Sequence, residues 1–293
     1  MAQTSELQPF REAIVCTYPE LSAAQFRLQN TGWDSIAVEV DDRLIFRFPR
    51  HETAKKALER ETSLLRVIRP AVTMRVPEPV LHAGPPFFSC HVKIEGEHLV
   101  PDVYAGLSES DREALAADLA QFYAELHALN AEQMRAAGAG PIRAWVEPEE
   151  MLRRIWPILP AEYRTEIERT VMSWQELPPD PHGETYGFFD GHGWNMAFDR
   201  ARNKLNGIYD FGDSGFGSLH QEFIYSNFIS RDLTIRICRA YERLTNRNLD
   251  RERIELMSTV LRISELAELH DDPRHGKNML GYLLGWLESR NSI

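Results

Sequence analysis

The chain contains few cysteines and no long apolar run, and these absences exclude several classes of protein. Its three cysteines, Cys16, Cys90 and Cys238, form an odd and scattered set. Such a set supports neither a disulfide framework nor a cysteine-based zinc site. No window approaches the ~18 consecutive apolar residues of a membrane helix, and the first fifteen residues lack the charged-then-apolar pattern of a signal peptide. We therefore expect a cytoplasmic protein that does not associate with membranes.

Basic residues are also in short supply, with 33 Lys and Arg against 44 Asp and Glu, for a net charge of −11. Nucleic-acid binding requires basic patches, so we exclude nucleic acid as a partner. An acidic chain is compatible with a cationic substrate, although acidity also serves solubility. The 293 residues, 43% of them hydrophobic, are enough for two lobes with cores of their own.

Periodicity predicts a small, mostly β lobe over residues 1–94. Apolar residues alternate over 36–40 and 44–48 on either side of Asp41 and Asp42, which is typical of a β-hairpin. Helical spacing predicts helices over 7–18 and 52–69. Residues 76–80 hold two prolines and are expected to be an extended connector, followed by a strand over 87–94.

The remainder, residues 95–293, is predicted to be a mostly helical lobe. Ser110 and Glu113 have the spacing of a capping box at the start of a helix. Further helices are expected over 148–156, 161–176, 221–245, 251–269 and 277–289. Residues 186–210 are the exception, because short strands are expected at 186–189, 196–198 and 205–209. The predicted fold class is therefore α+β, in two lobes.

The residues with the clearest chemical pattern lie in and just after this small β region. Asp190 and Asn195 are separated by four residues, and Asp210-Phe211-Gly212 follows. Kinases use this spacing to move a phosphoryl group from a nucleotide to a hydroxyl. Alone, Asp190 would be read as a turn former, and Asn195 and Asp210 as turn residues. Together they predict a catalytic carboxylate and two oxygen ligands for Mg²⁺.

Two neighbours of this pattern have open roles. His192 lies between two glycines and either touches substrate or phosphate or supports the loop. No His-x-x-x-His pair accompanies it, which argues against zinc. Asp213 either supports the loop or faces the substrate.

The first lobe is expected to contact a nucleotide. Residues 30–35 form a polar turn that ends at Ser35 and could cover phosphates with backbone N–H groups, but its single glycine matches neither GxGxxG nor the Walker pattern. Arg47 lies on the strand face opposite Phe46 and Phe48. Followed by a helix that carries Glu61, it matches the cation–glutamate pair that grips phosphates in kinases. The alternative for Arg47 is a surface cation.

These motifs resemble the aminoglycoside phosphotransferase family, a branch of the kinase-like fold. The resemblance rests on Asp190-x-His192-x-x-Asn195 and on IYDFGD at 208–213. LIFRFPR at 44–50, Glu61 and KIEG at 93–96 strengthen it, and they are particularly similar to aminoglycoside 2″-phosphotransferases. The resemblance spans residues ~25–225.

The resemblance implies a role for each matching position. Asp190 would be the catalytic base, Asn195 and Asp210 would bind Mg²⁺, and Arg47, paired with Glu61, would contact the phosphates of ATP or GTP. Lys93 and Glu95 would belong to a hinge at 93–96 against which the purine lies. A polyamine-like acceptor would meet acidic residues of the helical lobe, with these candidates: Asp213, Glu222, Glu265 and Glu268. Glu265 and Glu268 could equally form a solvated helix face. We expect the protein to be a monomer or a weak dimer.

The chain departs from the family at two positions. Phe188 stands where a histidine usually precedes the catalytic Asp by two residues, and Arg47 stands where the family usually has lysine. Arginine keeps the charge and a forked set of donors, and the macrolide phosphotransferases are similar in using it. Phe188 removes a hydrogen-bonding support, which either lowers the rate or shifts the support to His192. The alternatives are a kinase for a macrolide, choline, an amino alcohol or a sugar, and a non-catalytic nucleotide-binding pseudokinase.

Overall fold

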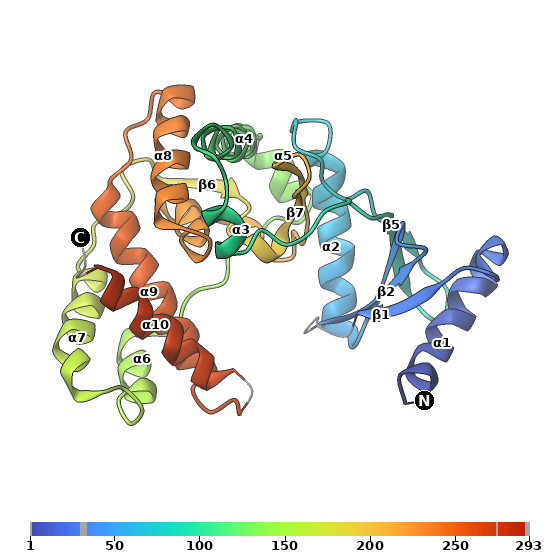
Figure 1. Cartoon of the computed structure of the whole chain (residues 1–293), viewed down its shortest axis with the longest axis horizontal. Helices are drawn as coiled ribbons and strands as arrows, with labels where there is room; N and C mark the ends of the chain where they lie inside the picture. Colours follow the sequence, from blue (N-terminus) through green and yellow to red (C-terminus); the bar gives the residue numbers. More distant parts are fainter. Residues whose placement is uncertain (1, 30–33, 274, 291–293) are drawn as a thin grey trace.

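The computed structural model describes residues 2–29, 34–273 and 275–290, which form a small sheet-containing lobe joined to a larger helical lobe (Figure 1). The predicted α+β architecture is thus confirmed, while the boundary at residue 94 stays a prediction. Residues 2 and 290, the first and last that are described, lie in different lobes (Figure 1). No helix among the described residues is long and apolar enough to cross a membrane.

The small lobe is built on an antiparallel five-stranded sheet with the strand order β1-β2-β3-β5-β4. The predicted hairpin is β2 (Ser35–Val40) and β3 (Leu44–Pro49), and the predicted strand near residue 90 is β5 (Phe88–Val92). Strands β1 (Phe26–Gln29) and β4 (Val80–His82) were not predicted, because both are too short to show alternation. Alternate residues of the hairpin, among them Phe46 and Phe48, pack against Ile14 of α1 (Ala2–Thr17).

Helix α2 (Glu52–Ile68) follows the hairpin, as predicted, and stands between the sheet and the helical lobe (Figure 1). The side chain of His51 caps it by accepting a hydrogen bond from Ala54 N. Its apolar face, with Leu64, Leu65 and Ile68, packs into the core of the large lobe. The same helix turns the buried Glu61 toward the junction of the lobes, so its position determines the geometry of the site.

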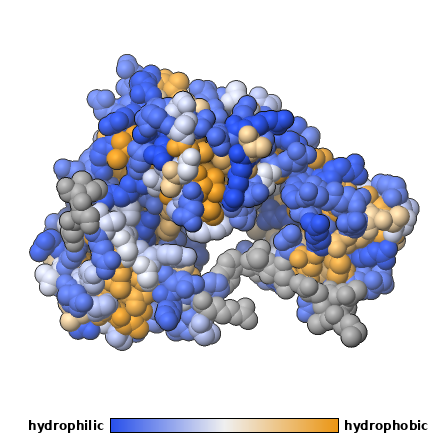
Figure 2. Space-filling model, viewed as in Figure 1, coloured by the Kyte–Doolittle hydropathy of each residue, from blue (hydrophilic) through white to orange (hydrophobic). Residues whose placement is uncertain are grey.

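The large lobe consists mainly of helices, whose bounds are α3 (Pro101–Ala105), α4 (Glu109–His127), α5 (Ala131–Ala136), α6 (Pro148–Ile155), α7 (Ala161–Gln175), α8 (Arg231–Thr245), α9 (Arg251–Leu269) and α10 (Gly276–Arg290). Two hydrophobic clusters hold it together. One is centred on α4, α8 and apolar residues of the segment 186–216, and the other joins α6, α7, α9 and α10. The outer surface in Figure 2 is largely hydrophilic, with small and scattered apolar areas.

Short strands lie within two residues of those predicted over 186–209. Strand β6 (Glu184–Gly187) pairs with β9 (Gly215–Ser218), and β7 (Met196–Asp199) pairs with β8 (Lys204–Ile208). Strand β9 was not predicted, because its sequence GFGS has little apolar character. Asp190 follows β6 in the first ladder, and Asp210 follows β8 in the second.

Three sequence predictions need correction or lie outside the described residues. The expected helix over 221–245 is two elements, a 3₁₀ helix η3 (Leu219–Phe228) and α8, because Ser230 starts a new helix by accepting from Asp232 N. The cap of α4 is Ser108, which accepts from Asp111 N, and not the box at Ser110. Of the polar turn 30–35, residues 30–33 lie outside the described residues.

Candidate active site

The loop between β6 and β7 holds Asp190 at the junction of the lobes. Two close approaches explain its glycines: a Cβ at Gly191 would lie 2.2 Å from the Tyr123 hydroxyl, and one at Gly193 would lie 1.8 Å from the Leu99 carbonyl oxygen. Phe189, just before Asp190, has a φ of 54°. A non-glycine residue in this region costs of order 1–3 kcal/mol, and such residues cluster at functional sites.

Both carboxylate oxygens of Asp190 have partners within the loop. The Nε2 atom of His192 lies 3.1 Å from Oδ1, and Nδ2 of Asn195 donates to Oδ2 at 2.6 Å. Burial opposes the charged form of His192, but the Asp190 carboxylate outweighs it and raises the pKa of His192. His192 therefore supports the loop, and the carboxylate is held in one orientation.

Phe188 is fully buried, and its ring packs on Phe211 at 4.8 Å and on Phe122 at 6.0 Å between centroids. The hydrogen-bonding support that a histidine would give here is thus replaced by aromatic packing between the catalytic loop and the Asp-Phe-Gly motif. Phe188 was expected either to lower the rate or to shift the support of the loop to His192, and the structure favours the second.

Glu222 was expected to bind substrate, and this expectation is wrong. Its side chain is fully buried, and its carboxylate accepts hydrogen bonds from the backbone N–H groups of Phe188 at 2.8 Å and Phe189 at 2.9 Å. Nε2 of His127 lies 3.3 Å away from the same carboxylate. Glu222 therefore holds the backbone that presents Asp190 and is out of reach of a substrate.

Asn195 and Asp210 are brought together by the β7–β8 ladder, and Tyr209 N donates to the Asn195 carbonyl oxygen at 3.0 Å. Asp210 has a φ of 67°, and its side chain is 52% exposed. An amide oxygen and an open carboxylate are hard ligands of the kind Mg²⁺ takes when phosphates and waters supply the rest. The two residues thus fit the predicted ion.

Arg47 and Glu61 form the predicted ion pair across β3 and α2. Nη1 of Arg47 lies 2.8 and 3.0 Å from the two Glu61 oxygens, and Nη2 lies 3.7 Å from Oδ1 of Asp210. The Glu61 carboxylate raises the pKa of Arg47 against the effect of burial. Glu61 also accepts from Phe211 N at 3.1 Å. The cation that the sequence predicts to contact phosphates is thereby joined to the Asp-Phe-Gly motif.

The other predicted nucleotide residues lie along the junction. The Lys93 ammonium pairs with Glu39 at 2.7 Å and with Asp42, so its side chain is already engaged. The Glu95 carbonyl oxygen accepts from Nδ2 of Asn206 at 2.8 Å, and its side chain is exposed. Ser35, at the start of β2, is buried opposite Pro49. The hinge role of 93–96 and the nucleotide role of Ser35 stay predictions.

Acidic groups gather around Asp190 on the helical side. Partial desolvation, Asp190 and Asp210 together raise the pKa of Asp213, whose side chain is open to solvent. Burial raises the pKa of Glu265 to about 7, against the opposing charges of Arg262 and His192. Glu268 is half-buried and pairs with Arg143 at 3.2 Å. Of the two helix-face candidates, Glu265 is the one whose surroundings include the catalytic loop.

Two aromatic residues beside the loop were missed by sequence reasoning. Trp194, directly before Asn195, is 43% exposed, and its ring meets that of His192 edge-on at 5.4 Å. Desolvation raises the pKa of Tyr225, with further contributions from Asp190 and Asp213. The signal for Trp194 was available, because a large aromatic inside a glycine-rich catalytic loop has no core position to fill.

The fold and the site together define a phosphotransferase of the kinase-like class. Residues 26–256 match the model of the phosphotransferase enzyme family known as APH, and the chain belongs to that family.

Similar solved structures agree with this assignment. They include a GDP complex of a mutant aminoglycoside 2'-phosphotransferase-IIIa (20% identity, TM-score 0.84, covering 96% of this chain and 97% of that one). They also include a GDP and kanamycin complex of APH(2")-IIIa (20% identity, TM-score 0.79, covering 98% of this chain and 99% of that one). A third is a macrolide 2'-phosphotransferase type I (16% identity, TM-score 0.69, covering 97% of this chain and 97% of that one). At these identities the likenesses establish the shared fold.

Proposed function

We propose that the protein transfers the γ-phosphoryl group of ATP or GTP to a hydroxyl of a cationic, aminoglycoside-like acceptor. The observation that carries this proposal is the position of Asp190, which His192 and Asn195 hold in one orientation beside Asp213 and Glu265. A carboxylate oriented in this way can accept the proton of an attacking hydroxyl, while neighbouring acids favour an acceptor that carries ammonium groups. The GDP and kanamycin complex among the similar structures supports the same acceptor class.

Each residue has a separate task in this mechanism. Asp190 orients the acceptor hydroxyl in line with the γ-phosphorus and receives its proton as the new oxygen–phosphorus bond forms. The bond from the γ-phosphorus to the β,γ-bridging oxygen breaks in the same transfer, and the nucleoside diphosphate leaves. Arg47, held by Glu61, contacts the phosphates of the donor. Asn195 and Asp210 would hold Mg²⁺, which neutralises charge on the phosphates when bound. Phe188, packed on Phe211, keeps the base and the Asp-Phe-Gly motif in one rigid unit.

A substrate panel tests the proposal directly. Purified protein with Mg²⁺ and either ATP or GTP is mixed with aminoglycosides, macrolides, choline, amino alcohols and sugars, and transfer is measured by product mass. Phosphorylation of an aminoglycoside supports the proposal. Transfer to a macrolide alone favours the second candidate, which the macrolide phosphotransferase likeness suggests. Nucleotide binding with no transfer to any acceptor would instead favour a pseudokinase.

Trp194 is expected to form one wall of the acceptor site. The W194A substitution should raise the acceptor KM about tenfold, because it removes a rigid, exposed ring that would stack against the apolar face of a sugar. The nucleotide KM should change by less than about twofold, since this is an acceptor effect. Tyr282→Ala removes another exposed aromatic, on α10, and serves as the matched control. Equal rises in both KM values would contradict an acceptor role.

Glu265 gives the stability of the protein a specific pH dependence. Its folded-state pKa of about 7 lies above the unfolded value of ~4.3. The folded state therefore binds the proton more tightly, and the associated stability is full below pH ~4.3 and is lost as the pH rises through 7. Glu265→Gln avoids this loss and should be more stable than the wild type by about 1–3 kcal/mol at pH 8.5, but not at pH 5.

Thermal melts of both proteins across this pH range measure the difference. Glu252→Gln, an exposed change on the same helix, is the control, and its difference from wild type should not grow with pH. A Glu265→Gln melting curve parallel to that of wild type at every pH would mean that this carboxylate lies on a solvated face.

A further inference from the structure

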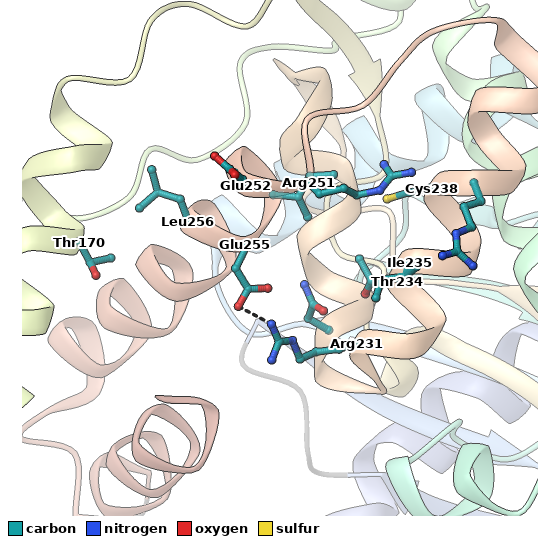
Figure 3. A pocket seen from close by; sticks show the side chains of 12 residues that line it. Thr170, Arg231, Thr234, Ile235, Cys238, Arg251, Glu252, Glu255 and Leu256 are labelled. Carbon is teal, nitrogen blue, oxygen red and sulfur yellow. Dashed lines mark hydrogen bonds and ion pairs between the residues drawn. The ribbon is translucent and has the colours of Figure 1, made fainter. Parts of the chain in front are cut away.

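A cavity lies in the helical lobe, between α8 and the first turns of α9. Its volume is about 530 Å³, within the range of small-molecule sites. Figure 3 shows Arg231, Thr234, Ile235 and Cys238 of α8 facing Glu255 of α9 across it. Glu255 and Glu265 are ten residues apart on α9, which corresponds to ~15 Å along the helix. The cavity is therefore separate from the acceptor site.

The lining of the cavity is richer in cations than the chain as a whole. Arg231, Arg239 and Arg251 stand against Glu252 and Glu255, an excess of one positive charge in a chain with a net charge of −11. Arg231 pairs with Glu255 at 2.8 Å, yet its Nη1 has no hydrogen-bond partner among the described residues. The exposed Arg239 makes no ion pair with any carboxylate in the described part of the chain. Two guanidinium groups thus have donors to offer.

The arrangement along α8 limits the shape of a ligand. Arg231, Ile235, Cys238 and Arg239 share one face of the helix, and the two arginines are eight residues apart, or ~12 Å along the axis. Between them lie apolar side chains, with Ile235 itself 42% exposed. The polar groups between them are already satisfied; Thr234, for example, bonds Ser226 at 2.8 Å. The face is therefore cationic at both ends and apolar in the middle.

We propose that this cavity binds an elongated small molecule with an anionic group at each end and an apolar body. Arg231 would receive one anionic group and Arg239 the other, while the exposed Ile235 contacts the body. Guanidinium groups bind carboxylates and phosphates alike through paired N–H donors. In both ligand classes the molecule is thus a dianion long enough to span the face of α8 from Arg231 to Arg239.

Calorimetric titration of the full chain at low ionic strength, without Mg²⁺, tests the proposal. The probes are suberate for carboxylates and 1,6-hexanediol bisphosphate for phosphates, with octanoate as a single-ended comparison. Saturable binding of at least one dianion, tighter than that of octanoate, is expected, and the tighter dianion identifies the ligand chemistry. Arg239→Gln should weaken it about tenfold, since a charged hydrogen bond contributes roughly 1.5–3 kcal/mol.

Two further variants locate the binding. Arg169→Gln removes an exposed arginine on α7 outside the cavity and should leave the affinity unchanged. Arg47→Gln removes the cation proposed to contact the donor phosphates and should also leave it unchanged. The proposal is overturned by an absence of binding, by octanoate binding as tightly as both dianions, by an unchanged affinity in Arg239→Gln, or by a loss of binding in Arg47→Gln.

Discussion

Asp190→Ala should abolish phosphoryl transfer and leave nucleotide binding intact. A positioned general base contributes about 10²–10⁴-fold to rate, and kcat should fall at least by that factor. The side chain is held by His192 and Asn195, and no contact joins it to the Arg47–Glu61 pair, which we propose contacts the phosphates of the donor. Steady-state turnover measures the first effect, and a Mg²⁺-dependent thermal shift with ATP and GTP measures the second.

Two companion variants sharpen this result. Asp190→Asn keeps the shape and one hydrogen-bonding oxygen but cannot accept a proton, so it should be nearly as inactive as Asp190→Ala. Asp271→Ala removes a carboxylate that is 81% exposed and far along the chain, and it should retain wild-type activity. Full residual activity in Asp190→Ala would refute the mechanism. Loss of nucleotide binding in the same variant would mean that the loop, rather than the base, had been damaged.

The arrangement of the site residues could be predicted from the sequence because it is local. Asp190, Asn195 and Asp210 lie within one short segment, where the spacing alone specifies two loops at the ends of paired strands. The Arg47–Glu61 pair was also predictable, because alternation on β3 and the next helix determine which faces meet. In each case the relevant partners are separated by fewer than about two dozen residues.

The predictions that failed depend on contacts between distant segments. Glu222 is 34 residues from Phe188, and nothing in its local sequence indicates that its carboxylate is buried against that backbone. The break between η3 and α8 is equally hidden, since Ile229 and Ser230 interrupt the helix without proline or glycine. Glu265 differs from Glu268 by less than one helical turn, yet the charges of His192 and Asp190 act on the pKa of Glu265, whereas Glu268 pairs with Arg143.

Glu222→Ala is the substitution with the largest expected effect on stability. It leaves the N–H groups of Phe188 and Phe189 buried without an acceptor, and each such group costs about 1–3 kcal/mol. The same bonds hold Phe189 at its φ of 54°, so their loss also releases the backbone that presents Asp190. The Tm should fall by about 5–10 °C, and kcat should fall even at temperatures where the variant is folded.

Glu222→Gln and Glu168→Gln separate the causes of this loss. Glutamine keeps one acceptor for the two N–H groups but turns an amide donor toward them, so its Tm should lie between those of wild type and Glu222→Ala. Glu168 is exposed on α7, and its change to glutamine should alter the Tm by less than about 1 °C. Nucleotide affinity in the folded Glu222 variants should stay within about twofold of wild type, because Arg47 and Glu61 do not contact this carboxylate. If Glu222→Ala left the Tm unchanged and raised only the acceptor KM, Glu222 would instead be a substrate-binding residue. Only a residue that contacts the acceptor would change that constant alone.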